Sequence, residues 1–385
     1  MKKTIALLMT LSMTLGLCAC HSFTGDETET PVPRFDMTVK YSYDDQQLET
    51  EDGTVYYRQE LGTVQVSSKD ERAAQKINET LGELYVSFAE TAGYTKKVAA
   101  DQSGDNGESI MTLSYECNPK AMRCDTRVLS LVFDVEQYIG GVHGGLQRVS
   151  RSFNADSGEL LTLADIAKNE DQLKTFLKNY VIGLAAGEEY YEDDGVCYLF
   201  DDAQEVIGSI VDEGEQWYFN DNGIVVYTNP YDIAPYAYGI LRFEVPYSAL
   251  EEFMDADYMP IDYEGENGMV LADAGSDTVR AELNMLDTVT VDENMQSVIL
   301  SAEETVYDVR IYSAERMLWQ RNYLTTGEGV EVISSIPDVL PNIAISYRLS
   351  DGTQVMRGIF QSGKDGSIIL TELTEDEPLY TADWQ

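Results

Sequence analysis

The sequence predicts an α+β protein with two antiparallel-sheet-plus-helix subdomains followed by a small C-terminal all-β sandwich-like domain. Three observations carry this prediction. A segment with apolar residues at helical spacing stands among strand-like runs in the first part of the chain. Asp221-Asn222-Gly223 marks a tight hairpin in the second part, because Asn-Gly supplies the positive φ angles of such turns. From about residue 268 to residue 373 short strand-like runs recur without a helical pattern.

The first subdomain is expected at residues 39–139. Residues 54–66 are rich in β-branched and aromatic residues and predict a strand. Residues 69–92 predict a helix, and 109–117 and 127–138 predict two further strands. The apolar positions of the helix are Ala73, Ile77, Leu81, Leu84 and Phe88.

The second subdomain is expected at residues 140–256. After a glycine-rich loop and a strand, the apolar pattern predicts a helix that ends near Ala186 and a shorter helix at 203–213. The Asn-Gly hairpin and a final strand with a short helix, at 238–254, complete this subdomain. The all-β domain is then expected at 257–385, with turns at 350–352 and 364–366.

The N-terminus indicates export. Lys2 and Lys3 precede an uncharged apolar run that is too short to span a bilayer and suits a secretory signal. The run ends in "LCAC", which resembles the lipobox of bacterial lipoproteins, with Cys20 as the lipidated residue. We therefore expect a signal peptide at 1–19, a flexible tether at 20–38, and lipid anchoring on the outer face of the bacterial cytoplasmic membrane. Ordinary secretion is the alternative.

The composition restricts the partners. The formal charge is −42, so the body repels phosphate backbones and nucleic acid is excluded as a natural partner. Membrane contact is expected through the lipid anchor only. The acidity favours a basic partner, although it also serves solubility alone.

Three cysteines follow the lipidation site. Cys117 and Cys124 flank "NPKAMR", which looks like a polar turn between two strands, so a disulfide across a hairpin and two unpaired thiols are both open. Cys197 receives no function.

Catalytic residues are hard to find in the sequence. His143 lies in "YIGGVHGG", and the other histidine, His21, lies beside the lipid anchor, so a zinc site of standard type lacks ligands. No G-x-S-x-G elbow is present. The acidic run 188–195 lacks the spacing of an EF-hand loop and indicates a solvated loop. We expect no enzyme activity, no catalytic residue, no metal and no cofactor.

The glycine-rich loop and a tyrosine-rich loop are the features that favour binding. The glycines of "YIGGVHGG" suit a bend between two strands. In "NPYDIAPYAYG", residues 229–239, two prolines stiffen a loop that presents tyrosines, and rigid tyrosines are common in recognition surfaces. Packing of these rings into the local core is the alternative.

Three blocks, "DVEQYIGGVHGG", "RSFNADSGELLTLADI" and "WYFNDNGIVVYTNPYDIAPYAYGILRFEVPYSAL", together resemble the extracellular domain of RsiV anti-sigma factors. The same region precedes the catalytic domain of PdaC-type peptidoglycan deacetylases. The resemblance covers roughly residues 39–254. It implies a lysozyme-binding module without the cytoplasmic or the catalytic part of those proteins. The matching candidates for ligand binding are Gly141, His143, Gly144, Tyr231, Pro235, Tyr236 and Tyr238.

The sequence thus leaves three hypotheses. The first is a non-enzymatic surface lipoprotein that captures or inhibits a cationic, lysozyme-like protein of the cell envelope. The second is a peptidoglycan- or glycan-binding lipoprotein in which tyrosines stack on sugar rings. The third is an envelope hydrolase that uses carboxylates.

Overall fold

The computed structural model describes residues 5–8, 36–68, 71–103, 111–186, 199–260, 278–282, 296–302, 304–313, 316–334, 343–362 and 367–372. The chain divides into two compact units, Met37–Pro260 and a second one formed by Met1–Asp36 with Ile261–Gln385. The fold class is α+β, as the sequence predicts. Among the described residues, no helix is both long and apolar enough to span a bilayer.

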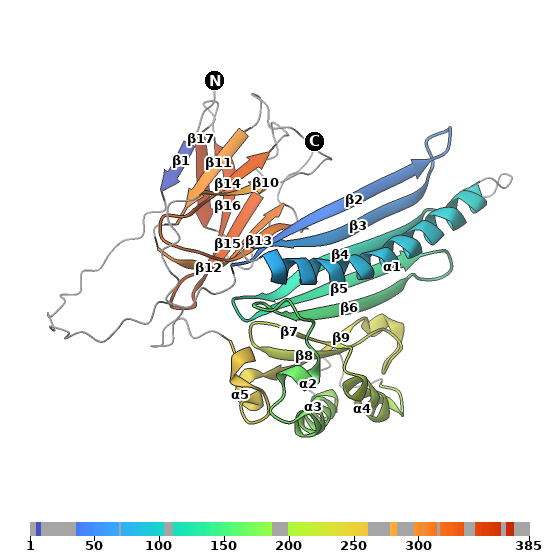
Figure 1. The fold of residues 1–385 in the computed structure, drawn as a ribbon. Coiled ribbons are helices and arrows are strands. Elements are labelled where there is room, and N and C mark those ends of the chain that lie inside the picture. Colours follow the sequence, from blue (N-terminus) through green and yellow to red (C-terminus); the bar gives the residue numbers. More distant parts are fainter. Residues whose placement is uncertain are drawn as a thin grey trace, which may run out of the picture. The chain divides into compact units, whose positions relative to one another are not determined.

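The first layer of Met37–Pro260 is a sheet that follows the chain order (Figure 1). Neighbouring strands are antiparallel except β3 and β4, which are parallel and are connected through helix α1. The strands and the helix are β2 (Thr38–Glu49), β3 (Val55–Ser67), α1 (Glu71–Ser103), β4 (Leu113–Cys124), β5 (Val128–Tyr138) and β6 (Gly145–Asn154).

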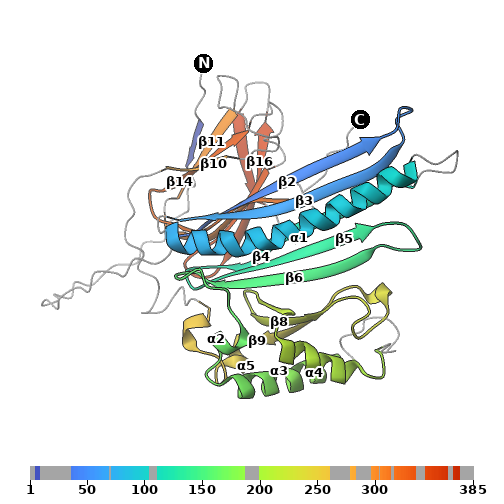
Figure 2. The ribbon, with the colours of Figure 1, turned by 45° about the vertical axis from the view of Figure 1, so that its right-hand side comes forward.

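Helix α1 covers one face of this sheet along its length (Figure 2). Its apolar stripe is buried at the spacing that the sequence predicts, including Ile77, Leu81 and Phe88. The ring of Phe88 lies 5.8 Å from that of Phe133 on β5, centroid to centroid. The helix extends to Ser103, eleven residues beyond the expected end at 92, and Ala99 on this extension is buried. Burial of the extension explains why it remains helical.

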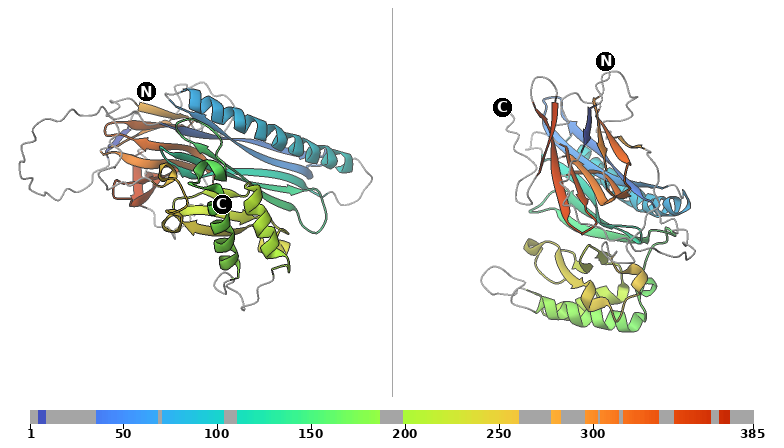
Figure 3. Two further views of the ribbon diagram at one scale, coloured as in Figure 1. Left: turned by 60° about the horizontal axis from the view of Figure 1, so that its bottom comes forward. Right: turned by 90° about the vertical axis from the view of Figure 1, so that its left-hand side faces the viewer.

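The opposite face of the sheet carries a second, smaller subdomain (Figure 3). It consists of an antiparallel sheet β7-β8-β9 and of helices on the far side of that sheet. The Phe219 amide donates to Ser130 Oγ at 3.0 Å, and Ser150 Oγ donates to the Trp217 carbonyl at 2.6 Å, so the two sheets are joined by buried hydrogen bonds. The elements are α2 (Leu163–Ile166), α3 (Glu170–Ala185), α4 (Ala203–Glu213), β7 (Trp217–Phe219), β8 (Gly223–Thr228), η2 (Tyr236–Tyr238), β9 (Leu241–Pro246), α5 (Tyr247–Leu250) and η3 (Ala256–Tyr258).

A buried arginine connects the two layers. Arg123 on β4 is 2% exposed and donates to Asp125, to the Tyr247 hydroxyl and to the Tyr258 carbonyl, each at 2.7 Å. Burial by itself lowers the pKa of Arg123, but the Asp125 charge and the Tyr247 contact reverse this and raise the pKa. The guanidinium is therefore always charged and holds α5 and η3 against the sheet.

The second unit is all-β among its described residues. One sheet has the order β17-β16-β15-β12-β13, and another has the order β1-β11-β14-β10. Trp319 and Ile311 are among its fully buried side chains. The strands are β1 (Ile5–Leu8), β10 (Thr278–Glu282), β11 (Gln296–Ser301), β12 (Val306–Ser313), β13 (Arg316–Leu324), β14 (Gly329–Ser334), β15 (Ile343–Arg348), β16 (Gln354–Ser362) and β17 (Ser367–Glu372).

The expected cysteine hairpin is wrong. Residues 113–124 form one continuous strand, β4, so Cys117 and Cys124 are seven residues apart on an extended chain, about 23 Å. A disulfide requires Cα atoms within about 7 Å. Both cysteines are accordingly buried thiols that are not joined in a disulfide. The run "NPKAMR" pairs with β5 on both sides of a bulge at Met122, with Pro119 opposite Phe133.

The expected boundary between the two subdomains, at residue 140, falls within the sheet. β5 and β6 are antiparallel neighbours from Val128↔Asn154 to Gln137↔Gly145, so residue 140 lies in the loop of a β-hairpin. Both expected subdomains belong to the single unit Met37–Pro260. The expected features at Cys20, at 188–195 and at Cys197, as well as most of the expected signal peptide and tether, lie outside the described residues.

Candidate ligand-binding site

The glycine-rich loop forms the tip of the β5–β6 hairpin. Gly140 and Gly141 have φ angles of 103° and 100°, which L side chains rarely adopt. A Cβ on Gly144 would lie 2.9 Å from the Gln137 carbonyl oxygen. The expectation of a bend between two sheet strands is therefore confirmed, and the glycines are required by backbone geometry.

The tyrosine-rich loop, residues 229–239, connects β8 to β9 and is held by its own hydrogen bonds. The Asn229 amide donates to Asp232 Oδ2 at 2.7 Å, and the Tyr231 amide donates to the Ala234 carbonyl at 3.2 Å. Asn229 Oδ1 accepts from the Arg148 amide at 2.7 Å, which fastens the loop to β6. Its aromatic side chains are thus presented by a fixed backbone.

The two loops meet in an aromatic cluster, which we call the aromatic site: His143, Tyr231 and Tyr236. The His143 ring stacks on Tyr236 with centroids 4.0 Å apart and an interplanar angle of 19°. Tyr231 lies 5.7 Å from Tyr236 and 6.1 Å from His143, centroid to centroid. The structure therefore brings together three of the residues that the sequence selected, from positions almost ninety residues apart.

Hydrogen bonds fix the histidine in one tautomer. His143 Nδ1 lies 2.8 Å from the Gly144 carbonyl oxygen, which can only accept, so Nδ1 carries the hydrogen. Nε2 of the neutral ring then accepts from the Tyr231 hydroxyl, 3.1 Å away. Both nitrogens of the neutral ring are occupied by protein contacts, so His143 acts here as a bridge between the loops.

Tyr231 combines backbone strain with exposure. Its φ angle is 72°, a left-handed conformation that costs an L residue about 1–2 kcal/mol. Its side chain is 56% exposed, so core packing does not compensate for this cost. Strained residues of this kind concentrate at functional sites.

Exposed apolar side chains lie next to the aromatic site. Val142, in the same hairpin tip, is 98% exposed, and Ile139 and Met111 are also exposed. Met111 Sδ accepts a hydrogen bond from the Tyr138 hydroxyl, which places it against the base of the tip. We call these three residues the apolar rim. Contiguous exposed apolar groups beside aromatic residues are typical of protein-binding surfaces.

A row of carboxylates crosses the sheet near the same hairpin, on the face opposite α1. In the strand register Asp45 lies opposite Glu60, Glu60 opposite Glu116, and Glu116 opposite Glu136. One acidic residue therefore stands on each of four adjacent strands. Neighbouring strands are about 4.8 Å apart, so the four positions form a close line. Glu136 is exposed and lies two residues before Tyr138. We call these four residues the acidic row.

The remaining candidates have structural roles. Pro235 precedes η2, and Gly141 supplies a positive φ angle at the hairpin tip. Tyr238 is half-buried and packs against the core of the small subdomain. Tyr227 on β8 is 1% exposed; burial raises its pKa to about 12, and its hydroxyl hydrogen-bonds with Ser150. The alternative, that the tyrosines pack into the core, therefore holds for Tyr227 and Tyr238, and not for Tyr231.

Within the part of the chain that the structure describes, no three His, Cys, Asp or Glu side chains converge in a way that could hold a metal ion. Sequence reasoning missed the apolar rim and the acidic row. Val142 and Ile139 are part of "YIGGVHGG". Because this stretch was expected to be a bend between two strands, the exposure of its two apolar side chains could have been predicted. The acidic row had no local signal, because its members are adjacent only through strand pairing.

Comparisons with known proteins support a family for one segment. Residues 164–248 match the model of a family described as "Protein of unknown function (DUF3298)". This segment includes the 229–239 loop and ends on α5, while the β5–β6 hairpin precedes it.

Two solved structures are similar to the chain. One is a member of the DUF3298 family from Bacteroides fragilis NCTC 9343, with 16% identity, a TM-score of 0.41, and coverage of 59% of this chain and 96% of its own. Another is a DUF3298 family protein from Pseudomonas aeruginosa PAO1, with 14% identity, a TM-score of 0.36, and coverage of 58% and 96%. No curated protein matches the sequence.

Proposed function

We propose that the protein is a non-enzymatic binding module of the bacterial cell envelope that captures or inhibits a cationic, lysozyme-like protein. The aromatic site is the observation that carries this proposal. Three aromatic rings from two rigid loops form one surface, and the rings carry little conformational entropy to lose on contact. The resemblance of the region to RsiV extracellular domains, and the lipobox-like N-terminus, support the partner and the location.

The charges around the site favour a basic partner. The acidic row adds negative potential on the face opposite α1, close to the β5–β6 hairpin. The chain carries −42 overall, so a cationic protein would be attracted from a distance. The apolar rim then offers the contact area that a protein partner buries on docking.

A glycan partner is the second candidate, and one observation favours it. The Tyr231 ring is more than half exposed, and exposed aromatic rings can stack on the apolar faces of sugars. A neutral glycan, however, gains nothing from the negative charge of the chain. Salt separates the two candidates, because charge-assisted capture weakens as ionic strength rises and stacking does not.

The test measures binding of a lysozyme at low and physiological salt to the protein and to two single variants. Tyr231→Ala removes a ring of the aromatic site that is 56% exposed. Tyr94→Ala removes a ring that is 58% exposed on helix α1, outside the site, and is the matched control. We expect salt-sensitive binding that Tyr231→Ala weakens about tenfold or more, while Tyr94→Ala leaves it unchanged.

Equal losses in both variants, or no binding to lysozymes of several types, would refute lysozyme capture at this site. Salt-insensitive binding of N-acetylglucosamine oligomers would then favour the glycan alternative. Release of soluble fragments from purified cell wall above a buffer control would contradict the non-enzymatic assignment.

A further inference from the structure

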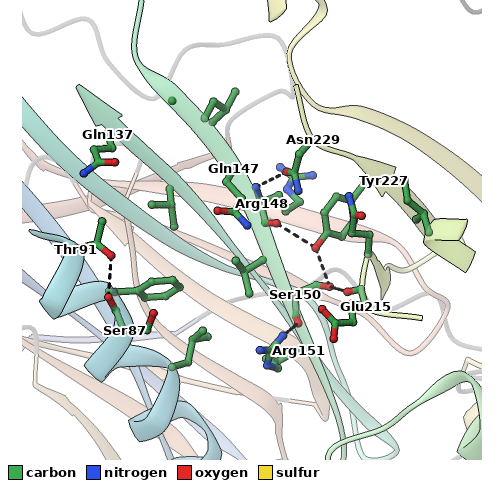
Figure 4. Close-up of a pocket in the computed structure, with 18 of the residues that line it drawn as sticks. Ser87, Thr91, Gln137, Gln147, Arg148, Ser150, Arg151, Glu215, Tyr227 and Asn229 are labelled. Atoms are coloured by element: carbon green, nitrogen blue, oxygen red, sulfur yellow. Dashed lines mark hydrogen bonds between the residues drawn. The ribbon is translucent and has the colours of Figure 1, made fainter. Parts of the chain in front are cut away.

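A groove runs along β6 and extends to Gly145 and Asn229, near the aromatic site, but no part of the proposed function uses it (Figure 4). It consists of two hollows of about 560 and 460 Å³ that share the lining residues Ser150, Arg151, Glu213 and Glu215. Helix α1 contributes Ser87 and Thr91 on one side, and the segment after α4 contributes Glu215 on the other. We call this feature the β6 groove. Each hollow has the size of a small-ligand pocket.

The groove is closed to an added β-strand. β6 is the last strand of its sheet, and edge strands can accept an extended peptide through the backbone. Here, however, the Arg148 amide already donates to Asn229 Oδ1, and the Arg148 carbonyl accepts from the Tyr227 hydroxyl at 3.2 Å. The Ser152 carbonyl accepts from the Leu161 amide at 2.7 Å. A ligand in the groove must therefore be recognised by side chains.

The side chains of the groove carry both signs of charge without pairing them. Arg151 donates one N–H to the Ser150 carbonyl at 2.7 Å and, within the described residues, lies within 4.0 Å of no carboxylate. Glu213 and Glu215 line the same two hollows and form no ion pair with any described residue. Arg148, in contrast, is paired with Asp134 on the opposite face of the sheet.

Neutral hydrogen-bonding groups stand beside these charges. Ser87 and Gln147 line the groove, and their side chains make no hydrogen bond with any described residue. Tyr115 also lines it, and its buried hydroxyl has no partner among the described groups. Buried hydroxyls are nearly always satisfied, so an unsatisfied one next to a hollow indicates a missing partner.

We propose that the β6 groove binds a short, extended peptide segment that presents both a carboxylate and an amino group. Arg151 receives the carboxylate through its remaining N–H donors, and Glu215, supported by Glu213, receives the ammonium. Ser87 and Gln147 hydrogen-bond further peptide groups along the larger hollow, beyond Arg151 and Glu215. A neutral sugar would satisfy the hydroxyl and amide groups but leave three charged side chains without a counterpart.

The experiment titrates the full-length protein, purified in mild detergent, with tetra-alanine in three forms: free ends, amidated C-terminus and acetylated N-terminus. Binding is followed by calorimetry up to about 1 mM peptide. We expect the free peptide to bind and each blocked form to bind about tenfold more weakly. Arg151→Gln should weaken the free peptide to the level of the amidated form, and Glu215→Gln to the level of the acetylated form.

Two control variants and one conservative variant test whether the effect comes from the groove. Lys97→Gln removes a positive charge from α1 outside the groove and should bind the free peptide normally. Tyr231→Ala should also bind it normally, so failure at the aromatic site and failure at the groove are distinguishable. Arg151→Lys, which keeps the charge but not the fork of donors, should bind with intermediate affinity. Unchanged thermal unfolding of each variant shows that the fold is intact.

Three results would contradict peptide binding in the β6 groove. Absence of binding by all three peptides would overturn the proposal. So would binding that Arg151→Gln leaves unchanged. Tighter binding of tri-N-acetylglucosamine than of the free peptide, weakened by Gln147→Ala but not by Tyr231→Ala, would assign the hollow to a neutral saccharide instead.

Discussion

At the residue scale, Tyr231 combines a strained backbone with an exposed side chain. Its left-handed backbone is imposed by the turn that the Tyr231 amide closes with the Ala234 carbonyl. The aromatic ring gains no burial in return, and its hydroxyl holds His143 in place. A glycine would adopt the same φ angle at no steric cost. Selection of a tyrosine at this position therefore favours a role in contact with a partner.

This reasoning predicts that Tyr231→Gly separates stability from binding. Relief of the left-handed strain offsets the extra flexibility that glycine gives the unfolded chain, so the free energy of unfolding should change by less than about 1 kcal/mol. Binding at the aromatic site should be lost, because the ring and its contact to His143 disappear. Urea unfolding and lysozyme binding on the same sample measure both. A loss of several kcal/mol would show that the ring serves the fold.

The buried cysteines give a second prediction at this scale. Burial raises the pKa of the Cys117 thiol to about 12, with a smaller contribution from the Asp134 charge. The thiolate is the reactive form, so Cys117 is protonated and unreactive at neutral pH. We expect iodoacetamide at pH 8 to modify neither Cys117 nor Cys124 in the folded protein and to modify both in urea. Peptide mass spectrometry would detect the difference, and a Cys117–Cys124 disulfide in the untreated protein would contradict the structure.

Residue patterns in the sequence predicted only part of the candidate site. Glycines and a histidine in one stretch, and prolines with tyrosines in another, were enough to select both loops. The contact between them could not be predicted, because the chain separation of His143 and Tyr231 carries no information about sheet stacking. The β6 groove had no pattern at all. Arg151 and Glu215 become neighbours of one hollow only after β7 packs on β6.

At the element scale, periodicity predicted the types of the elements better than their ends and connections. The stripe from Ala73 to Phe88 specified α1. The expected polar turn at 118–123, however, was an incorrect interpretation of part of a strand that is buried on alternate positions. Polar residues are tolerated in β4 because they face the side opposite α1. Pairing to β3 and β5 on both edges determines its conformation, and pairing is not visible in local composition.

Close packing between α1 and the turn after β6 gives an element-scale prediction. Gly158 has a φ angle of 71°, and a Cβ there would clash with the Ala73 carbonyl oxygen in the first turn of α1. Gly158→Ala should lower the free energy of unfolding by about 2–4 kcal/mol through strain and displacement of the helix. Gly183→Ala, in α3 with open space around it, should instead raise stability by about 0.5–1 kcal/mol.

Urea unfolding of the two variants against the parent protein tests this pair, because both replace glycine by alanine within Met37–Pro260. A similar stability for Gly158→Ala and the parent would mean that the turn can move away from α1. It would then contradict the close approach of the turn and the helix.

At the scale of the whole molecule, composition and periodicity predicted the α+β class and the all-β C-terminal part. They could not predict that one sheet continues through the hairpin at residue 140 and joins two helix-containing layers into a single unit. Strand-to-strand register across that hairpin is a long-range property. The consequence for function is that both loops of the aromatic site, and both walls of the β6 groove, belong to one unit.

Buried tyrosines distributed over both units predict how the molecule responds to alkali. Burial raises the pKa of Tyr57, Tyr227, Tyr247 and Tyr323 to about 12, from an ordinary value of 10.0. The unfolded chain therefore loses these protons at lower pH than the folded chain does. Their contribution to stability is present below pH 10 and is lost as the pH rises from 10 to 12.

We expect the absorbance of tyrosinate at 295 nm to rise in two stages between pH 9 and 13, since exposed rings ionise first. The second stage should coincide with loss of the far-ultraviolet circular dichroism and should be steeper than a one-proton titration, because unfolding releases several buried hydroxyls together. Return to neutral pH should restore both signals if unfolding is reversible. A single stage centred near pH 10, with unchanged circular dichroism, would show that these rings are accessible in the folded protein and that the packing described here is wrong.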